Sequence, residues 1–433
     1  MAESWQTWII EPRDPLIARD GRPFGPTPGA RAASLPFPFP STTTGGVRTR
    51  AGLDAQGRFV ADPQQVRQIA VRGPLLVELD GERTIRQWLA PAPADALLVE
   101  TRPGQADPAT RQWLRPILPD AGAHTNLPGG THAALLADLL PVGPAFYNPN
   151  KAAAGVPRFW YWDVFQAWLQ NPADGAQAHR QVRPDQAAST LWVLGPPDQP
   201  AGQIELGHSG PHPEQRLHVG IDPGTLASRE GALFQTRGLE FTGPDRRRLA
   251  LAVTSDGTFP HAGDGFAPLG GERRLVSWRA STAPLPACPP AIRQAVVDRK
   301  ACRVVLLTPA VFAAGFYPTT LLQPGAEVSC SLRGVVCGRP QVVSGWDFAY
   351  VGAGGSRGQP KPSRRLAPAG SVLFLQLAGS PQAIGRWVDD HWMQCVSDDD
   401  QDRRDGFGLA AIGTWDEPPG PMQFAPDRQE DSR

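Results

Sequence analysis

Arginines and hydroxyl side chains gather near the start of the chain, and together they favour contact with phosphate groups. A Pro- and Gly-rich loop carries Arg19 and Arg22, and a run of four hydroxyl residues at 41–44 then precedes Arg48 and Arg50. An arginine guanidinium binds phosphate oxygens in a bidentate manner, and the unpaired N–H groups at a helix start attract anions. The same residues also fit an ordinary capped helix with solvated arginines, so both interpretations stay open.

A second candidate site is the sequence Gly270-Gly271-Glu272-Arg273-Arg274. Two glycines let the backbone come close to a ribose-phosphate chain, and the two arginines can then neutralise that chain. A tight structural turn has the same composition, because glycine also adopts backbone angles that other residues avoid. The residues alone leave both interpretations open.

A third candidate site lies in the C-terminal half of the chain. The run 351–358 imitates a dinucleotide-binding fingerprint, but Gln-Pro-Lys-Pro at 359–362 cannot form the helix that such a site requires. The loop can instead hold Lys361, Arg364 and Arg365 beside a phosphate. A mobile surface loop is the competing interpretation.

No residue pattern predicts catalysis. His208, His212 and His218 have no supporting pair of cysteines, so they are weak candidates for a metal site. The acidic run at 398–402 could hold Mg²⁺ but is more typical of a solvated loop. Nucleophile-elbow, Walker A and Gly-Gly-Asp-Asp strings are missing from the sequence. We therefore expect no catalytic residues, no metal and no cofactor.

The composition is typical of a globular protein. If the protein binds RNA, its basic groups must be concentrated in one part of the surface. The 433 residues carry no formal net charge, and 41% of them are hydrophobic. Neutrality argues against a uniformly basic RNA binder, so any RNA site must be a patch. The first ten residues do not resemble a signal peptide, and no apolar run reaches the roughly 18 residues of a membrane span. Five cysteines without regular spacing predict no disulfide framework, and we expect a cytoplasmic protein.

The elements that must position these groups are strands and helices in a mixed order. Apolar runs predict strands at 8–10, 249–253, 274–278, 303–307, 328–336, 341–344, 371–377 and 409–414. Two strands are predicted within 66–79, and a hairpin pairs 217–221 with 232–241. Helices are predicted at 45–53, 161–169 and 381–394. Hydroxyl residues 41–44 are expected to cap the first helix, because prolines hold 36–40 extended.

This order predicts an α+β protein with two ferredoxin-like domains, the first with large insertions. The first domain spans residues 1–282, with insertions at about 91–215 that are rich in Pro, Ala and Gly. Four prolines within 281–290 indicate a Pro-rich linker at 283–300. The second ferredoxin-like domain then covers 301–433.

Several sequence blocks resemble the third subunit of the type III-B (Cmr) CRISPR effector complex, which belongs to the RAMP superfamily (repeat-associated mysterious proteins). The longest are EPRDPLIARDGRPF and FPFPSTTTGGVRTR near the N-terminus. Shorter blocks are RLHVGID at 216–222 with GALF at 231–234, and LGGERR at 269–274. The series ends with TPA at 308–310, SGWD at 344–347, PKP at 360–362 with PAGS at 368–371, and GFGL at 406–409 with IGTW at 412–415. The order of the blocks, more than any single block, makes the resemblance specific.

The resemblance implies a non-catalytic RNA-binding subunit of an antiviral, RNA-guided complex. Such a subunit grips the 5′ tag of the CRISPR RNA, docks on the large cyclase-like subunit and the backbone RAMP subunits, and meets target RNA indirectly. The hairpin around 222–230 would act as a thumb that pins a nucleotide between tag and guide. The implied RNA-binding residues are Arg19, Arg22, Ser41, Thr42, Thr43, Thr44, Arg48, Arg50, Arg216, His218, Gly270, Gly271, Arg273, Arg274, Lys361, Arg364 and Arg365.

Two other functions stay open at this point. A metal-independent RAMP endoribonuclease that matures CRISPR RNA needs a general base near the scissile 2′-OH, and His218 and His261 are the candidates. The neutral net charge also fits a scaffold that contacts only protein. An RNA-binding assay at several salt concentrations distinguishes the scaffold from the other two.

Overall fold

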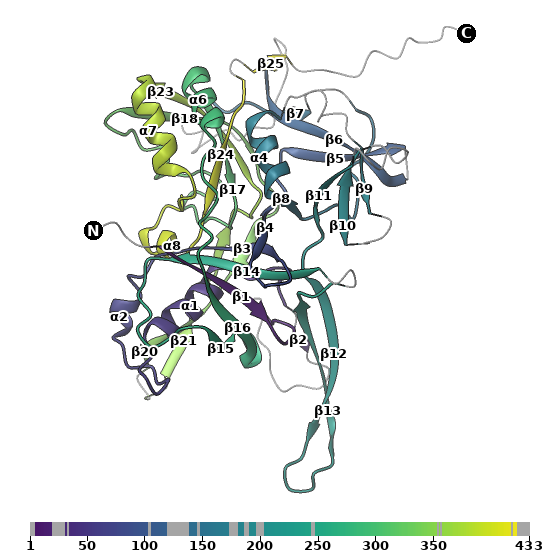
Figure 1. Cartoon of the computed structure of the whole chain (residues 1–433), viewed down its shortest axis with the longest axis vertical. Coiled ribbons are helices and arrows are strands. Elements are labelled where there is room, and N and C mark those ends of the chain that lie inside the picture. Colours follow the sequence, from purple (N-terminus) through teal and green to yellow (C-terminus); the bar gives the residue numbers. More distant parts are fainter. Residues whose placement is uncertain are drawn as a thin grey trace.

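The computed structural model shows a mixed α/β protein rich in strands (Figure 1). It describes residues 5–19, 31–32, 34–102, 105–118, 138–144, 148–172, 181–185, 190–195, 203–243, 247–352, 355, 357–416 and 419–421. The helices are α1 (Pro40–Ala51), α2 (Pro63–Val66), α4 (Trp162–Gln170), α6 (Pro290–Arg299), α7 (Pro381–His391) and α8 (Asp400–Arg404), with a 3-10 turn η2 (Gly271–Arg273).

The strands fall into a long N-terminal series and a shorter C-terminal one. The first series is β1 (Gln6–Pro12), β2 (Arg31–Ala32), β3 (Val71–Leu79), β4 (Ile85–Pro91), β5 (Ala96–Arg102), β6 (Gln105–Leu118), β7 (Val142–Pro144), β8 (Phe159–Tyr161), β9 (Gln181–Pro184), β10 (Leu191–Leu194), β11 (Ile204–His208), β12 (His212–Ile221), β13 (Ser228–Glu240), β14 (Arg248–Ser255), β15 (Gly265–Leu269) and β16 (Arg274–Ser281). The second is β17 (Ala301–Leu306), β18 (Val328–Val336), β19 (Gln341–Val343), β20 (Trp346–Val351), β21 (Arg357–Pro360), β22 (Arg364–Leu366), β23 (Val372–Gly379), β24 (Ala410–Gly413) and β25 (Gly420–Pro421).

Strand β1 lies inside the larger sheet, between β14 and β16, and runs antiparallel to both. Its apolar residues Trp8, Ile9 and Ile10 are buried. Successive side chains of a strand point to opposite faces, so Trp8 and Ile10 pack in one core cluster with Val47 of α1 while Ile9 packs in another. The predicted entry of this run into a buried sheet is confirmed.

The larger sheet continues through the segment that was predicted as insertions. Its order is β15-β16-β1-β14-β3-β4-β8-β11-β10-β9-β6-β25, with β5 and β7 also paired to β6. Strands β5 to β11 lie within 91–215, so this segment extends the sheet sideways rather than forming only loops. Helix α4 packs near β4 and β8 and buries Phe165 and Trp168.

The smaller sheet has the order β18-β23-β17-β24, and every neighbouring pair is antiparallel. If these four strands are numbered in the order in which they occur in the sequence, their order across the sheet is second, third, first, fourth. Four strands of the larger sheet repeat this arrangement, because β3, β14, β1 and β16 lie side by side in that order and are also antiparallel. The two halves of the chain therefore share one strand arrangement.

Two predicted segments are corrected by the structure. Residues 283–300 are not a linker, because α6 occupies most of them and buries Ile292 and Val296. Pro290 begins this helix, and proline is favoured at a first helical position because the missing N–H would have no partner there. Residues 71–79 form one strand rather than two. Between Ala252 and Thr254 of β14 the pairing shifts register, because β3 carries one extra residue there, at its Gly-Pro pair.

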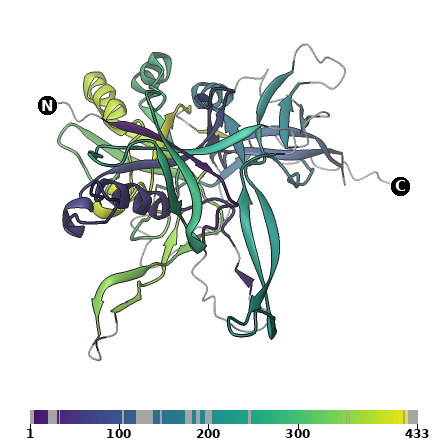
Figure 2. The ribbon, with the colours of Figure 1, turned by 60° about the horizontal axis from the view of Figure 1, so that its bottom comes forward.

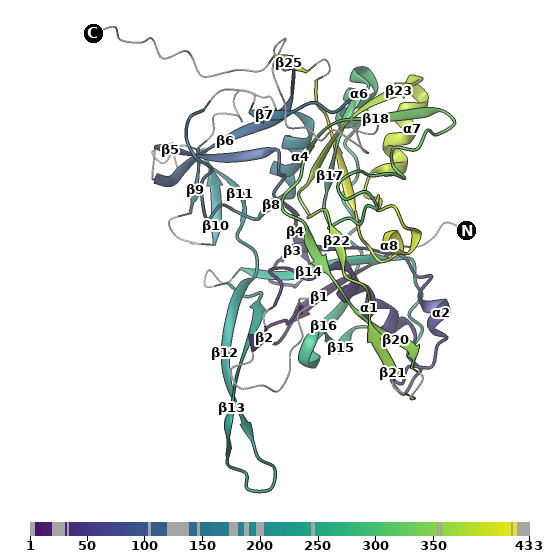
Figure 3. The same cartoon turned by 180° about the vertical axis from the view of Figure 1, so that it is seen from behind.

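Two long hairpin structures leave the body on the same side, as Figures 2 and 3 show. We call β12 and β13, residues 212–240, the N-terminal arm. We call β19 to β22, residues 341–366, the C-terminal arm. The sequence-predicted hairpin is confirmed as the N-terminal arm, whose strands pair from His212 opposite Glu240 to Ile221 opposite Ser228.

Candidate nucleic-acid interface

Residues 16–19 and 34–39 form a floor between the two arms. Leu16 pairs with Leu239 at the base of the N-terminal arm, and Arg19 pairs with Ser34. Phe39 packs with Val343 and Leu366 at the base of the C-terminal arm. The floor therefore connects the two arms through contacts between residues that lie far apart in the sequence.

The glycine-rich loop packs directly on this floor. Gly271 donates its N–H to the Ile17 carbonyl oxygen at 2.7 Å. Gly270 has a φ of +72°, and a Cβ at that position would lie 2.5 Å from the same oxygen, so only glycine fits. Glu272 forms an ion pair with Arg19, and Arg273 is exposed. The loop is a tight turn that presents a cation beside the floor, and RNA contact by it stays a prediction.

Helix α1 begins earlier than predicted, and hydroxyls do not cap it. It starts at Pro40, and its N-cap residue is Phe39, whose side chain makes no capping hydrogen bond. Thr43 and Thr44 are buried: Thr43 donates to the Pro40 carbonyl at 3.1 Å and Thr44 to the Asp405 carbonyl at 2.7 Å. Proline presets the helical φ, which explains why the helix starts at residue 40. Ser41 is exposed and Thr42 half-buried.

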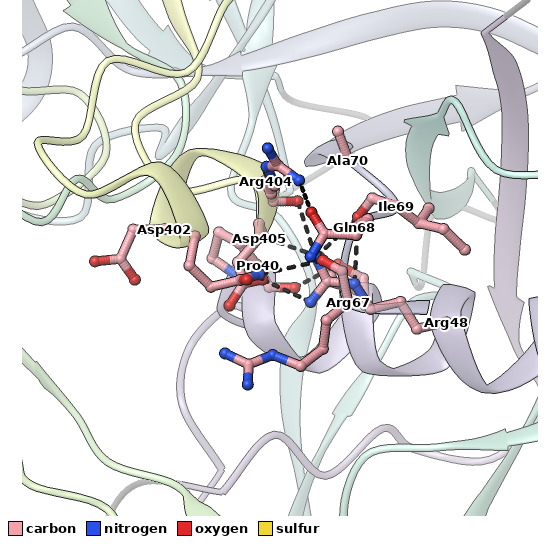
Figure 4. Close-up of polar contacts among 12 residues, drawn as sticks. Pro40, Arg48, Arg67, Gln68, Ile69, Ala70, Asp402, Arg404 and Asp405 are labelled. Atoms are coloured by element: carbon pink, nitrogen blue, oxygen red, sulfur yellow. Dashed lines mark hydrogen bonds and ion pairs between the residues drawn. The ribbon is translucent and has the colours of Figure 1, made fainter. Parts of the chain in front are cut away.

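Arg48 connects α1 to the C-terminal half of the chain (Figure 4). Its Nη1 forms an ion pair with Asp405 at 2.6 Å, and its Nε and Nη2 donate to the Ile69 carbonyl at 3.2 and 2.8 Å. Only 12% of its side chain is exposed. Arg404 donates to Gln68 in the same group of contacts. Arg48 thus stabilises the junction between the two halves.

Arg50 lies inside the N-terminal half. Its side chain is 6% exposed, lies over the rings of Trp8 and Trp278 at 5.6 and 5.0 Å, and donates to the Gly263 carbonyl. Burial lowers the pKa of its guanidinium from the ordinary value, and the Asp264 carboxylate acts in the opposite direction. Arg48 and Arg50 are therefore enclosed. In the glycine-rich loop, by contrast, Arg273 is exposed and Arg274 is half-buried.

The N-terminal arm carries Arg216 and His218 on one face. Arg216 is exposed and forms an ion pair with Glu214 at 2.8 Å. The His218 ring stacks on Phe234 at 5.1 Å, and its Nε2 lies 2.8 Å from the Thr236 hydroxyl. The aromatic pair gives this face a flat surface on which a base can stack.

The C-terminal arm carries Lys361, Arg364 and Arg365. Lys361 and Arg365 are exposed. Arg364 forms an ion pair with Asp402 and lies 5.7 Å over the Phe407 ring, so it fixes the base of the arm on α8. Arg22, the remaining predicted residue, lies outside the described residues.

The structure also contains a cavity that sequence reasoning missed. It has a volume of about 180 Å³ and lies at the floor, where residues 35–40 meet Arg158, Phe159 and Gln341. The alternation of proline and phenylalanine at 36–40 was the only sequence signal for it, because the other residues come from distant segments.

Among the described residues, no three His, Cys, Asp or Glu side chains are placed to hold a metal ion. His208 is buried, and its Nδ1 accepts a hydrogen bond from the Gly210 N–H at 2.8 Å. None of the described helices is long and apolar enough to span a membrane.

A family model described as "CRISPR-associated protein (Cas_Cmr3)" matches residues 8–415. The chain belongs to this family. The resemblance to the third subunit of the type III-B CRISPR effector is thereby confirmed, and the chain is a subunit of that effector. The match covers both arms, the floor and the glycine-rich loop.

Comparison with solved structures gives similar chains in two cryo-EM structures of a type III-B Cmr-β complex. One complex is bound to cognate target RNA and AMPPnP (state 1), and the other to cognate target RNA. The identities are 12% and 13%, each alignment covers 85% of this chain and 86% of the other, and both TM-scores are 0.40. No curated protein sequence matches the chain.

Proposed function

We propose that the chain is a non-catalytic RNA-binding subunit of the type III-B effector. It holds the 5′ tag of the CRISPR RNA between its arms and bridges the large cyclase-like subunit to the backbone subunits. Target RNA is then met only through the CRISPR RNA. The observation that carries this proposal is the common direction of the two arms, with the floor and the glycine-rich loop at their bases.

Exposed cations on these parts support contact with a phosphate backbone. Arg216 lies on the N-terminal arm, Lys361 and Arg365 lie on the C-terminal arm, and Arg273 lies on the loop beside the floor. A chain with no net charge needs such a local concentration to bind RNA. The enclosed residues Arg48, Arg50, Thr43 and Thr44 then support the surface from below rather than touching RNA.

The opposite face of the N-terminal arm supports docking on a neighbouring subunit. Because side chains alternate along a strand, Leu217 and Val219 point away from Arg216 and His218, and Leu233 lies opposite Val219. These three aliphatic side chains are 66%, 46% and 52% exposed. An exposed apolar face of this kind favours a protein partner, and the backbone RAMP subunits are the proposed one.

Each half of the chain is further proposed to be a ferredoxin-like unit. The shared order of four antiparallel strands supports this assignment. The division at about residue 282 follows from it, since β16 ends the first unit and β17 begins the second.

A salt titration of RNA affinity tests the proposal. Replacing Arg273 and Arg274 with alanine should flatten the slope of log affinity against log salt by roughly one unit, because each phosphate contact on single-stranded RNA contributes about 0.7. Lys361→Ala with Arg365→Ala should act similarly. A matched control replaces the exposed Arg299 and Arg386, which lie on α6 and α7, away from the arms.

The outcomes distinguish the candidate functions. Unchanged affinity and slope in both test variants would place RNA elsewhere on the molecule. No RNA binding by the chain or its complex would favour the protein-only scaffold. Specific cleavage of repeat RNA that His218→Ala abolishes would favour the endoribonuclease; we expect the RNA to stay intact, since His218 is engaged with Phe234 and Thr236.

A further inference from the structure

A second cavity lies where the two halves of the chain meet. It has a volume of about 480 Å³, and we call it the junction pocket. The described walls of this pocket and of the floor cavity share no residue, and α8, beside the pocket, lies on the opposite side of the body from the N-terminal arm (Figures 1 and 3). The N-terminal half contributes Trp5, Arg72 and Asp256 to its wall, and the C-terminal half contributes Gln394, Arg403 and Arg404.

Arg72 of β3 is the cation on the N-terminal side of the pocket. Its guanidinium carbon lies 3.7 Å over the Trp5 ring, and its Nη2 donates to the Gln394 Oε1 at 2.7 Å. The indole ring and the carboxamide are both neutral. They therefore fix the guanidinium in place without cancelling its charge.

Two further cations come from α8. The Arg403 Nη1 donates to the carbonyls of residues 397–398 at 2.7 and 2.8 Å, and Arg404 donates to the Gln68 Oε1. Asp400 forms ion pairs with both arginines, at 3.0 and 3.1 Å. The Asp400 side chain is 68% exposed, so solvent screens these two pairs.

Positive charge exceeds negative charge around the pocket. Asp256 is the acidic residue of the described wall, and its Oδ1 accepts the Ala70 N–H at 2.8 Å. Burial raises the pKa of Cys395, another wall residue, to about 12, so its thiol is neutral near pH 7. Even when Asp400 is included, three guanidinium groups are opposed by two carboxylates.

This arrangement suits phosphate better than carboxylate. A carboxylate has two oxygens, which one guanidinium fork can satisfy, whereas linked phosphate groups present more anionic oxygens over a longer span. A volume of about 480 Å³ also has room for several linked groups. Three arginines at one pocket therefore favour a ligand with more than one phosphate.

We propose that the junction pocket binds an anion that carries two or more phosphate groups. The anion connects the two halves of the chain, because Arg72 belongs to the first half and Arg404 to the second. Helix α8 also carries Asp402, which pairs with Arg364 at the base of the C-terminal arm, and Figure 4 shows Asp402 and Arg404 leaving α8 in different directions. The bound anion thus stabilises the junction and the helix on which this arm rests. This inference does not rest on the proposed function, since the pocket is separate from the floor.

Calorimetric titration of the full-length protein with inorganic pyrophosphate tests the proposal. One binding site is expected at low ionic strength. Submillimolar pyrophosphate should also raise the melting temperature, because a ligand that binds only the folded protein stabilises it. Sodium chloride at the same ionic strength should not reproduce this effect.

Two variants assign the binding to the pocket. Gln394→Glu keeps the shape of the side chain and places a carboxylate against Arg72, so it should abolish pyrophosphate binding without lowering the melting temperature. Arg404→Gln should weaken binding roughly tenfold or more, since hydrogen bonds to a charged group are lost. The matched control is Arg67→Gln, which makes the same charge change at an exposed residue outside the described wall and should leave affinity within about twofold.

Two more probes identify the source of the phosphate groups. Adenosine triphosphate and a short single-stranded RNA are each titrated into the unaltered protein and into Gln394→Glu. Loss of triphosphate binding in the variant would assign the pocket to a free anion, and loss of RNA binding would assign it to a nucleic-acid strand. Either loss supports phosphate recognition by this pocket.

Three results would overturn the proposal. The first is no pyrophosphate binding by the unaltered protein at millimolar concentration. The second is unaltered affinity in both Gln394→Glu and Arg404→Gln. The third is tighter binding of a hexaglutamate peptide than of pyrophosphate, which would assign the pocket to an acidic segment of a protein partner. None of these results bears on RNA binding at the arms, which the Arg273 and Arg274 variants measure separately.

Discussion

Arginine side chains stabilise the interior of this protein as well as its surface. Arg303 on β17 and Asp95 before β5 form an ion pair in which both side chains are fully buried. Arg303 also donates to the Thr414, Trp168 and Leu169 carbonyls, so its charge is well satisfied. This residue joins the N-terminal sheet, helix α4 and the C-terminal sheet.

Breaking this pair should destabilise the protein strongly. Arg303→Leu leaves a buried carboxylate without its cation, which should lower the free energy of unfolding by about 3–5 kcal/mol. The surface pair Arg293 with Asp389 is 39% and 51% exposed, so Arg293→Leu should cost less than about 1 kcal/mol. Urea denaturation of both variants measures the difference, and equal costs would contradict the assigned role of Arg303.

The cysteines give a second prediction at the scale of residues. Burial raises the pKa of Cys288 to about 11 and those of Cys330 and Cys395 to about 12, and it also raises that of Cys302. These thiols stay protonated at pH 8, whereas Cys337 is exposed. Only the thiolate attacks a disulfide reagent, so the folded protein should show one fast-reacting thiol at pH 8.

Counting the thiols that react with Ellman's reagent checks this prediction. Cys337→Ser should remove the fast phase and leave four thiols that react only in denaturant. Any fast-reacting thiol in the Cys337→Ser variant would contradict this prediction and would mean that at least one of the other four cysteines opens readily to solvent.

The sequence indicated which residues are basic but not which of them are enclosed. The Arg48 partner Asp405 lies 357 positions away, and the Asp95 partner of Arg303 lies 208 positions away. Propensity and periodicity act over a few residues, so neither contact leaves a local pattern. The glycine-rich loop was more accessible to prediction, because the positive φ of Gly270 requires glycine.

Strands and helices with strong apolar patterns were predicted well. The run at 328–336 coincides with β18, and the helix predicted at 381–394 is α7, which ends three residues earlier. The helix predicted at 161–169 is α4, displaced by one residue. Errors arose at prolines: the residues before α1 and α6 looked extended or linker-like, although proline is a favoured first residue of a helix.

The N-terminal arm can be tested as an element. A shortened variant replaces residues 220–232 with Asn-Gly. The paired residues Val219 and Leu233 are then connected by a two-residue turn. The removed residues include Ile221 and Leu226, which are 55% and 80% exposed, so the melting temperature should change by no more than about 2 °C. Affinity for tag RNA should fall severalfold if the N-terminal arm holds the tag as proposed.

Differential scanning fluorimetry and RNA footprinting measure these two effects. Loss of stability would mean that the tip packs on the body. Unchanged affinity together with an unchanged footprint would remove the arm from the proposed RNA surface.

At the scale of the whole molecule, the two halves share one hydrophobic core. The largest cluster includes Leu98 and Trp168 from the N-terminal half with Val304 and Leu375 from the C-terminal half. Helix α6, at the predicted linker, contributes Ile292 to the same cluster. Halves with a common core should not fold independently, even though each has its own arrangement of four antiparallel strands.

A split chain tests this dependence. When residues 1–282 and 283–433 are produced separately, each half should be insoluble, because it exposes the apolar side chains that the other half covers. Produced together, they should associate and copurify through a tag on one half. The Arg303→Leu version of the same pair should lose most of the recovered partner, since the buried Asp95 would then have no cation across the contact. A cooperative, monomeric unfolding transition from either half alone would contradict a shared core and would make the two halves independent domains.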